Sequence, residues 1–174
     1  MIFELDKAIE ILERTPSTIE TLLDGISKEW LKHNEGDNTW SPYEIVGHLI
    51  HGEKTDWIPR AKIILSESQN KTFEPFDRFA QNKQGQKKTI SELLKEFKKL
   101  RTENIKELQS LNIDEQALKK RGVHPELGEV NLKELLSTWV VHDLGHISQI
   151  SRVMAKQYKE EVGAWKAYLG ILKR

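Results

Sequence analysis

Two histidines four residues apart, His142 and His146, lie in a segment with strong helical periodicity. A separation of four residues places two side chains on one face of a helix, with Cβ atoms about 5–6 Å apart. Two imidazoles at that separation can bind one metal ion. Because Leu135, Trp139 and Val153 fall on the same side of the helix, the pair lies at the edge of its inward face. Buried imidazoles need polar partners, and a metal ion would serve both.

A third ligand would come from a facing helix, and His48 is the candidate. Three neutral imidazoles leave an open coordination position for a water molecule, which then becomes a source of hydroxide near neutral pH. Nitrogen ligands suit Zn²⁺, Ni²⁺, Cu²⁺ or Fe²⁺, and the order of affinities does not choose among them. His48 could equally be a hydrogen-bonded core histidine. Gly52, one turn later, could make room for a ligand or only for close helix packing.

Four polar residues could support the ligands by contacting them from outside: Glu44, Glu53, Thr138 and Gln149. Each of them could instead be a helix cap or a surface residue. Three tryptophans near these positions could form the apolar wall of a substrate pocket or could fill the core: Trp40, Trp57 and Trp139.

The other histidines have different expected places. His33 lies in a predicted polar loop. His51 is on the same helix as His48, and its side chain is rotated from that of His48 by about 60° around the helix axis, to the opposite side. His124 precedes Pro125 in a predicted loop, where it could be structural or could line the mouth of a cleft.

The composition limits the class of protein. A chain of 174 residues predicts one domain over residues 1–174 with a substantial core. Basic and acidic residues balance at 27 each, which argues against nucleic acid as a partner, since phosphate binding requires a basic excess. The absence of cysteine excludes disulfides, a catalytic protein thiolate and cysteine-bound metal. No apolar run approaches the ~20 residues needed to cross a membrane, and residues 1–7 do not resemble a signal peptide, so we expect a cytoplasmic protein.

Apolar spacing of about 3.6 residues predicts four long helices. They cover residues 3–25 with a kink at Pro16, residues 41–65 with a kink at Pro59, residues 89–111, and residues 131–156. A capping box begins each of the last three helices. Ser41, Thr89 and Asn131 are each followed by a Glu three residues later.

The segments between the helices are polar. Residues 33–39 predict a loop, residues 66–88 a long connection anchored by Phe73, Phe76 and Phe79, and residues 121–130 a loop or a short hairpin. The tail, residues 160–172, predicts a short fifth helix. The expected fold is therefore all-α, an antiparallel four-helix bundle with one polar crossover and a short extra C-terminal helix.

Three blocks of sequence resemble the DinB/YfiT-like superfamily of small helical proteins, which is unrelated to the DNA polymerase that shares the DinB name. The blocks are WSPYEIVGHLIHGE at residues 40–53, HPELGEVNLKELL at residues 124–136 and HDLGHISQI at residues 142–150. The order of the blocks is more specific than any one of them, and the similarity covers nearly the whole chain.

The resemblance implies a bundle in which His48, His142 and His146 hold a divalent metal ion, for which we expect Zn²⁺ or Ni²⁺. It also implies similarity to thiol-dependent transferases and isomerases that use mycothiol or bacillithiol, and to metal-dependent hydrolases. Members of the superfamily commonly form dimers, so we expect a homodimer.

We therefore expect an enzyme in which the metal activates water or a low-molecular-weight thiol for attack on a small electrophile. No residue pattern fixes the substrate, and no catalytic residue beyond the ligands is identified. The alternative is a non-catalytic, metal-binding or stress-related helical module.

Overall fold

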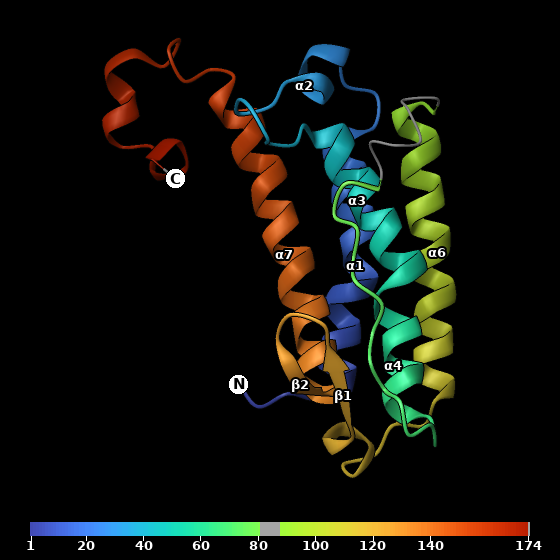
Figure 1. The fold of residues 1–174 in the computed structure, drawn as a ribbon. Helices are drawn as coiled ribbons and strands as arrows, with labels where there is room; N and C mark the ends of the chain where they lie inside the picture. Colours follow the sequence, from blue (N-terminus) through green and yellow to red (C-terminus); the bar gives the residue numbers. More distant parts are fainter. Residues whose placement is uncertain (81–87, 174) are drawn as a thin grey trace.

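The long helices lie side by side as a bundle (Figure 1) in the computed structural model, which describes residues 1–80 and 88–173. Their bounds are Leu5–Leu23 for α1, Pro42–Thr55 for α3, Trp57–Leu65 for α4, Ile90–Ser110 for α6 and Leu132–Lys156 for α7. Helices α3 and α4 form one broken column of the bundle. The predicted all-α four-helix bundle is confirmed.

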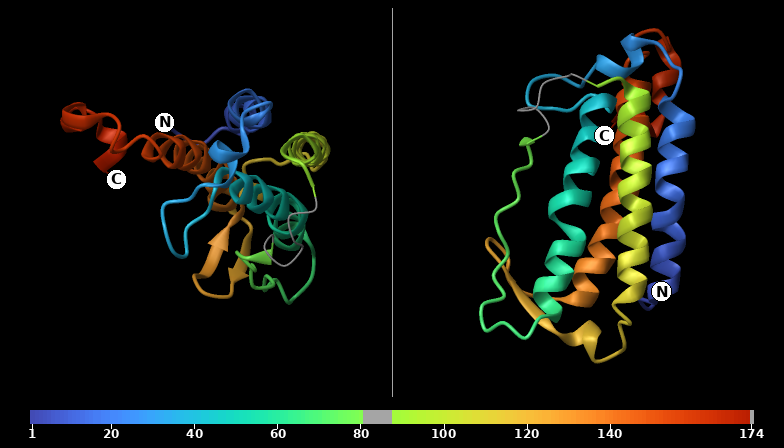
Figure 2. Two further views of the ribbon diagram at one scale, coloured as in Figure 1. Left: turned by 90° about the horizontal axis from the view of Figure 1, so that it is seen from above. Right: turned by 90° about the vertical axis from the view of Figure 1, so that its right-hand side faces the viewer.

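Two consecutive columns run in the same direction, which corrects the prediction of an antiparallel bundle. The column of α3 and α4 and the helix α6 both descend in Figure 1, whereas α1 and α7 ascend. The chain after α4 returns along the outside of the bundle before α6 begins (Figure 2). Both α6 and α7 pack against α1 and α3, so α6 and α7 face each other across the bundle.

Pro16 lies inside α1 without ending it. Proline has no backbone N–H, so the carbonyl of Leu12 loses its intrahelical partner. The Nη1 atom of Arg101 donates to that carbonyl at 2.8 Å. The helix ends at Asp24 and is followed by Gly25, whose φ of 75° suits glycine.

All three predicted capping boxes form, at Ser41 with Glu44, Thr89 with Glu92 and Asn131 with Glu134. The predicted kink near Pro59 is a complete break at Asp56, between α3 and α4. Pro59 cannot donate to the carbonyl of Thr55, so the helical ladder is interrupted there.

The predicted loop or hairpin at residues 121–130 is a hairpin of two antiparallel strands, β1 (Arg121–His124) and β2 (Gly128–Asn131). The connection after α4 is fixed to this hairpin, because Phe73 N donates to Val123 O at 2.9 Å. Phe73 is buried and Phe76 is half-buried, whereas Phe79 is 42% exposed and contacts Trp40 edge-on, with ring centroids 6.1 Å apart. Residues 81–87 of the predicted connection lie outside the described residues.

The ends of the bundle carry two features that differ from the prediction. A short helix, α2 (Lys28–Lys32), precedes the predicted loop. The tail forms two 3₁₀ helices, η2 (Gly163–Ala167) and η3 (Gly170–Lys173), instead of one α-helix. Gly163, with φ of 52°, is in the left-handed region and prevents a continuous helix. The tail projects away from the bundle (Figure 1).

None of the described helices combines the length and the apolar character that a membrane crossing requires.

Candidate metal centre and its cleft

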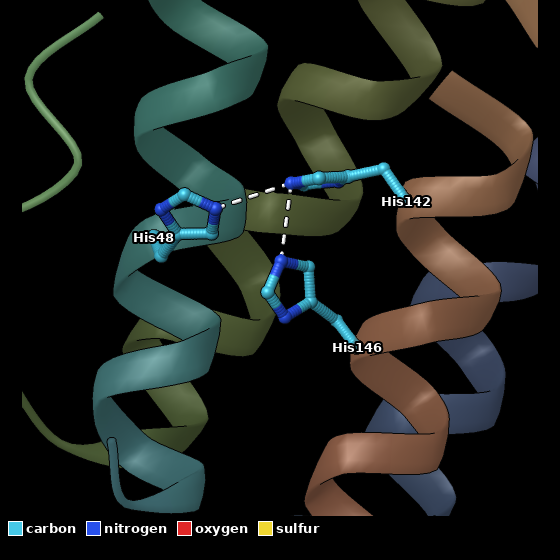
Figure 3. Close-up of side chains that lie close together, drawn as sticks. All are labelled: His48, His142 and His146. Carbon is cyan, nitrogen blue, oxygen red and sulfur yellow. Dashed lines mark hydrogen bonds between the residues drawn. The ribbon is translucent and has the colours of Figure 1, made fainter. Parts of the chain in front are cut away.

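Three histidines from two helices point toward one another (Figure 3). His48 comes from α3, and His142 and His146 come from successive turns of α7. The Nε2 atom of His142 lies 3.1 Å from Nε2 of His48 and 3.1 Å from Nε2 of His146. One ring nitrogen from each of the three lies within 4.8 Å of the others. The spacing of His142 and His146 on α7, together with His48 on the facing helix α3, thus brings together the three residues that were predicted from the sequence.

Two of the three separations between the nitrogens suit tetrahedral coordination of a metal ion. Tetrahedral Zn²⁺ with Zn–N bonds of about 2.0–2.1 Å separates two ligand nitrogens by about 3.3–3.4 Å. The two separations of 3.1 Å lie close to this value. Among the described residues, the cluster that could hold an ion contains only these three side chains, so a bound ion would keep an open coordination position.

Burial keeps two of these rings neutral. Burial and the neighbouring rings of His146 and His142 lower the pKa of His48 to about 2. Burial and the ring of His142 lower the pKa of His146 to about 4, although Gln149 acts in the opposite direction. A neutral imidazole keeps a lone pair, which is the form that binds a metal ion.

The outer nitrogens of the rings have different surroundings. Nδ1 of His146 lies 2.8 Å from Oε1 of Gln149, so it can donate a proton to that oxygen and leave the Nε2 lone pair for a metal. Nδ1 of His142 is buried, has no hydrogen bond within residues 1–80 and 88–173, and lies 4.0 Å from Oδ1 of Asp143. Nδ1 of His48 is also buried without a hydrogen bond among the described residues.

A cleft of about 400 Å³ opens beside the histidines. Aromatic rings form its walls: the ring centroid of Trp40 lies 4.5 Å from that of His48, and the ring of Trp57 lies 5.1 Å from that of His142. Gly52 also lines the cleft, and a Cβ atom there would lie 3.3 Å from Nε1 of Trp57. The glycine therefore makes room for the indole that contacts His142.

Two charged groups enter this mostly aromatic cleft from the break between α3 and α4. Asp56 and Arg60 both line it and both are buried. Their Oδ1 and Nε atoms lie 2.6 Å apart, but the oxygen makes no hydrogen bond of acceptable geometry, so the contact is Coulombic. Burial raises the pKa of Asp56, and the charge of Arg60 opposes part of that effect. At the mouth, the guanidinium of Arg78 lies 5.5 Å from the ring centroid of Trp40.

The chain matches the sequence profile of the DinB superfamily over residues 11–150. The chain belongs to the DinB superfamily.

A solved structure shares this fold. It is YfiT from Bacillus subtilis, described as a probable metal-dependent hydrolase with an unusual four-helix bundle topology. The similarity has a TM-score of 0.75 and 21% sequence identity, and covers 90% of each chain. At that identity it shows the fold alone. No curated protein matches the chain.

A buried ionic layer lies behind the histidines of this DinB superfamily protein. The guanidinium of Arg101 on α6 donates to Glu53 on α3 at 2.7 Å and to Asp143 on α7 at 2.6 Å. With its bond to Leu12 on α1, it joins all four columns of the bundle. Burial opposes the charge of Arg101, but Glu53 and Asp143 together raise its pKa above the ordinary value. The layer fixes α3 and α7, the two helices that carry the histidines.

The four possible supporting residues have different contacts. Gln149 contacts His146, as expected of a residue that orients a ligand. Thr138 lines the cleft, and its hydroxyl donates to the carbonyl of Glu134. Glu44 has the alternative role of a helix cap that was left open for it, and Glu53 contacts neither the histidines nor a helix end. The carboxylate of Glu44 caps α3, and that of Glu53 binds Arg101 and Asn104.

The remaining histidines lie outside the cluster of three. His124 lines the cleft, which agrees with one of its two predicted roles. His51 is half-buried, with its ring centroid 4.9 Å from that of Phe76. His33 is exposed, as expected of a loop residue.

Four residues of the cleft and the ionic layer were not predicted from the sequence: Arg101, Asp143, Asp56 and Arg60. Arg101 carried a usable signal, because it occupies an inward position in the apolar stripe of Phe97, Ile105 and Leu108. A charged residue in such a stripe indicates a buried ion pair.

Proposed function

We propose that this protein is a metal-dependent enzyme that activates water or a low-molecular-weight thiol for attack on a small electrophile. The observation that carries the proposal is the convergence of three imidazole nitrogens, from His48, His142 and His146, at the wall of the cleft. A purely structural metal would not need an open cleft beside it.

The three histidines would hold a divalent ion, Zn²⁺ or Ni²⁺, because neutral imidazoles suit these ions. When bound, such an ion supplies Lewis acidity, which lowers the pKa of a water or thiol nucleophile. Gln149 would keep His146 in the tautomer with a free Nε2 lone pair. Trp40 and Trp57 would hold the electrophile against the histidine end of the cleft and reduce the access of water.

Metal content tests the ligand set first. The purified protein should contain one divalent ion per chain by elemental analysis, and His48→Ala, His142→Ala and His146→Ala should each lose it. His33→Ala, which removes an exposed histidine, is the matched control and should keep the ion. A ligand variant with full occupancy and unchanged affinity would show that its histidine does not bind the ion.

Two probe reactions test the activity and distinguish the nucleophiles. Hydrolysis of p-nitrophenyl acetate reports activation of water, and conjugation of cysteine to 1-chloro-2,4-dinitrobenzene reports activation of a thiol. The loaded protein should accelerate at least one reaction, and chelation or His48→Ala should remove the acceleration. A loaded protein that accelerates neither reaction would favour the non-catalytic metal-binding module.

A further inference from the structure

The carboxylate of Asp56 occupies an unusual position at the break between α3 and α4. Asp56 is the N-cap residue of α4, and an aspartate there ordinarily accepts a hydrogen bond from the backbone N–H two or three residues later. The third residue is Pro59, which has no N–H, and Asp56 makes no side-chain cap bond. The proline therefore removes one of the two usual local partners, and the carboxylate does not bond to the other, the N–H of Ile58.

The carboxylate faces the same cleft as the histidines. Asp56 is 9% exposed, lines the cleft, and lies on the helix face of His48 and Gly52, at successive separations of four residues. The next residue, Trp57, contacts His142 through its ring at 5.1 Å. Asp56 thus lies on the wall that leads to the histidine end.

Arg60 binds the carboxylate incompletely. Its Nε atom lies 2.6 Å from Oδ1 without acceptable hydrogen-bond geometry. The guanidinium is also held elsewhere, because Nη2 donates to the carbonyl of Glu74 at 3.3 Å and the group lies 5.1 Å from the ring centroid of Phe73. Because Oδ1 is itself covered by protein, a molecule in the cleft would meet the part of the Asp56 side chain that stays 12% exposed.

We infer that Asp56 is the proton acceptor of the cleft, a catalytic residue for the attack of the nucleophile on the electrophile. The inference rests on the proposed function. The oxygen of water, or the sulfur of the thiol, forms a bond to the electrophilic atom as its proton passes to the Asp56 carboxylate. The bond between that atom and the leaving group breaks with its electron pair, and the Asp56 carboxyl then protonates the leaving group.

The surroundings of Asp56 suit this exchange of a proton. Burial raises the pKa of the carboxyl, and a catalytic acid–base group works best with a pKa moved toward the working pH. The charged and titratable groups that act on it from α3, α4, α7 and β1 are His51, Arg60, His142 and His124, and each of them opposes the effect of burial. Protonation to the neutral carboxyl therefore occurs at a higher pH than for an exposed aspartate.

The first test compares two variants of the ion pair in the zinc-loaded protein, with the same two probe reactions. Asp56→Asn should reduce kcat by about 100-fold or more, which is typical of a lost proton acceptor. It should also remove the acidic limb of the pH profile, with zinc content unchanged at each pH. Arg60→Gln should keep most of the plateau rate and move that limb to higher pH, because loss of the cation raises the pKa of Asp56. Glu67→Gln, which changes a side chain that is 96% exposed, is the control and should behave as the wild type.

The second test does not depend on turnover. Carbon-13 NMR of the side-chain carboxyl of Asp56, assigned by its absence in Asp56→Asn, should show a titration midpoint above the ordinary value of about 3.9 in the metal-free protein. Zinc loading should lower that midpoint, because a cation in the same cleft favours the charged carboxylate. A midpoint that zinc does not change would overturn the assignment.

The two proposals fail in different ways. If the wild type accelerates neither probe, the proposed function fails and the catalytic role of Asp56 fails with it. If the wild type is active and Asp56→Asn keeps its rate, only the role of Asp56 is wrong. Equal losses in Asp56→Asn and Arg60→Gln would mean that the pair is structural. If Asp56→Asn does not fold, Asp56→Ser replaces it, and a folded Asp56→Ser that keeps the rate and the acidic limb of the wild type would also overturn the role.

Discussion

For each histidine of the cluster, a single neighbouring residue can determine which ring nitrogen faces the other two histidines. Gln149 lies on α7 within reach of the outer nitrogen of His146, and the contact between Oε1 and Nδ1 is 2.8 Å long. An amide oxygen that accepts from Nδ1 fixes both the tautomer and the orientation of the ring. The corresponding group for His142 is Asp143, at 4.0 Å, where a small rotation of the ring would complete the hydrogen bond.

We expect Gln149→Leu to weaken metal binding by about 10-fold or more, because residues that orient ligands commonly contribute 10–100-fold to affinity. The change leaves the apolar core of α7 intact. Calorimetric titration of the metal-free protein with Zn²⁺ measures the effect. Ser151→Ala removes a hydroxyl that bonds only to the carbonyl of Ile147 on the same helix, and its affinity should match the wild type. An unchanged affinity in Gln149→Leu would mean that the amide does not orient the ligand.

The metal-free protein should lose stability in mild acid because of His48 and His146. Their pKa values in the folded state, about 2 and about 4, lie below the value of about 6.5 expected in the unfolded chain. Below pH 6.5 the unfolded chain therefore binds more protons, so stability is full above that pH and falls as the pH decreases toward the folded values. Each histidine should remove up to about 2 kcal/mol between pH 7 and pH 5.

Urea unfolding at both pH values, with a chelator present, measures this loss. The double variant His48→Gln and His146→Gln should lose less stability over the interval, whereas His33→Gln should follow the wild type. An acid dependence that is the same in all three proteins would contradict the assignment of the effect to the buried rings.

At the scale of the helices, Arg101 makes contacts that join the columns of the bundle. Its guanidinium donates a hydrogen bond to the carbonyl that Pro16 leaves free on α1, and it neutralises carboxylates on α3 and α7. Removing one member of a buried ionic group leaves an uncompensated charge, which costs about 3–5 kcal/mol.

We therefore expect Arg101→Met to lower the free energy of unfolding by about 3–5 kcal/mol. Lys99→Met, at a position on α6 that is 74% exposed, should change it by less than about 0.5 kcal/mol. Combining Arg101→Met with Glu53→Leu and Asp143→Leu should recover part of the loss, because apolar replacement of a whole buried ionic group is often neutral. Urea unfolding at pH 7 measures all three proteins. A triple variant less stable than Arg101→Met would show that the charges themselves stabilise the bundle.

The helices and the histidines were predictable from the sequence because their signals are local. The capping box at Ser41 defines the start of α3, and the spacing of His142 and His146 places both on one face of α7. The partners of Arg101 were not predictable, because they depend on which helices lie next to one another in the bundle. The same holds for Asp56, because Pro59 shows that one capping partner is missing but the cleft is formed by other elements. The parallel course of α4 and α6 depends on the path of the connection between them, which has no helical periodicity.

At the scale of the whole molecule, the outer face of α7 exposes apolar side chains that the bundle does not cover. Val141 is 68% exposed and Leu144 is 48% exposed, and their separation of three residues places them side by side on the helix. The C-terminal tail adds Trp165 and Tyr168, which are also exposed. Exposed apolar groups gathered on one face are typical of protein interfaces, which supports the proposal of a homodimer.

If this face is the dimer interface, Val141→Asp combined with Leu144→Asp should convert a dimer to a monomer. Light scattering during size-exclusion chromatography measures the mass, to be compared with the chain mass of 20.2 kDa. Thr102→Asp, on the exposed side of α6, is the control and should remain dimeric. A wild type that elutes as a monomer at all concentrations would contradict the dimer, and a double variant that stays dimeric would place the interface elsewhere.

The separation of the histidines along the chain has a consequence for biosynthesis. His48 and His142 are 94 residues apart, so the first ligand is synthesised long before the other two. The cluster cannot be completed until His142 and His146 have also been synthesised and have left the ribosome. An isolated imidazole on an unfinished bundle binds metal weakly compared with three that converge. The growing chain therefore lacks the assembled set of three imidazoles until the segment with His142 and His146 has been made, and an ion would be acquired only after that point, from the metal ions that the cell then offers.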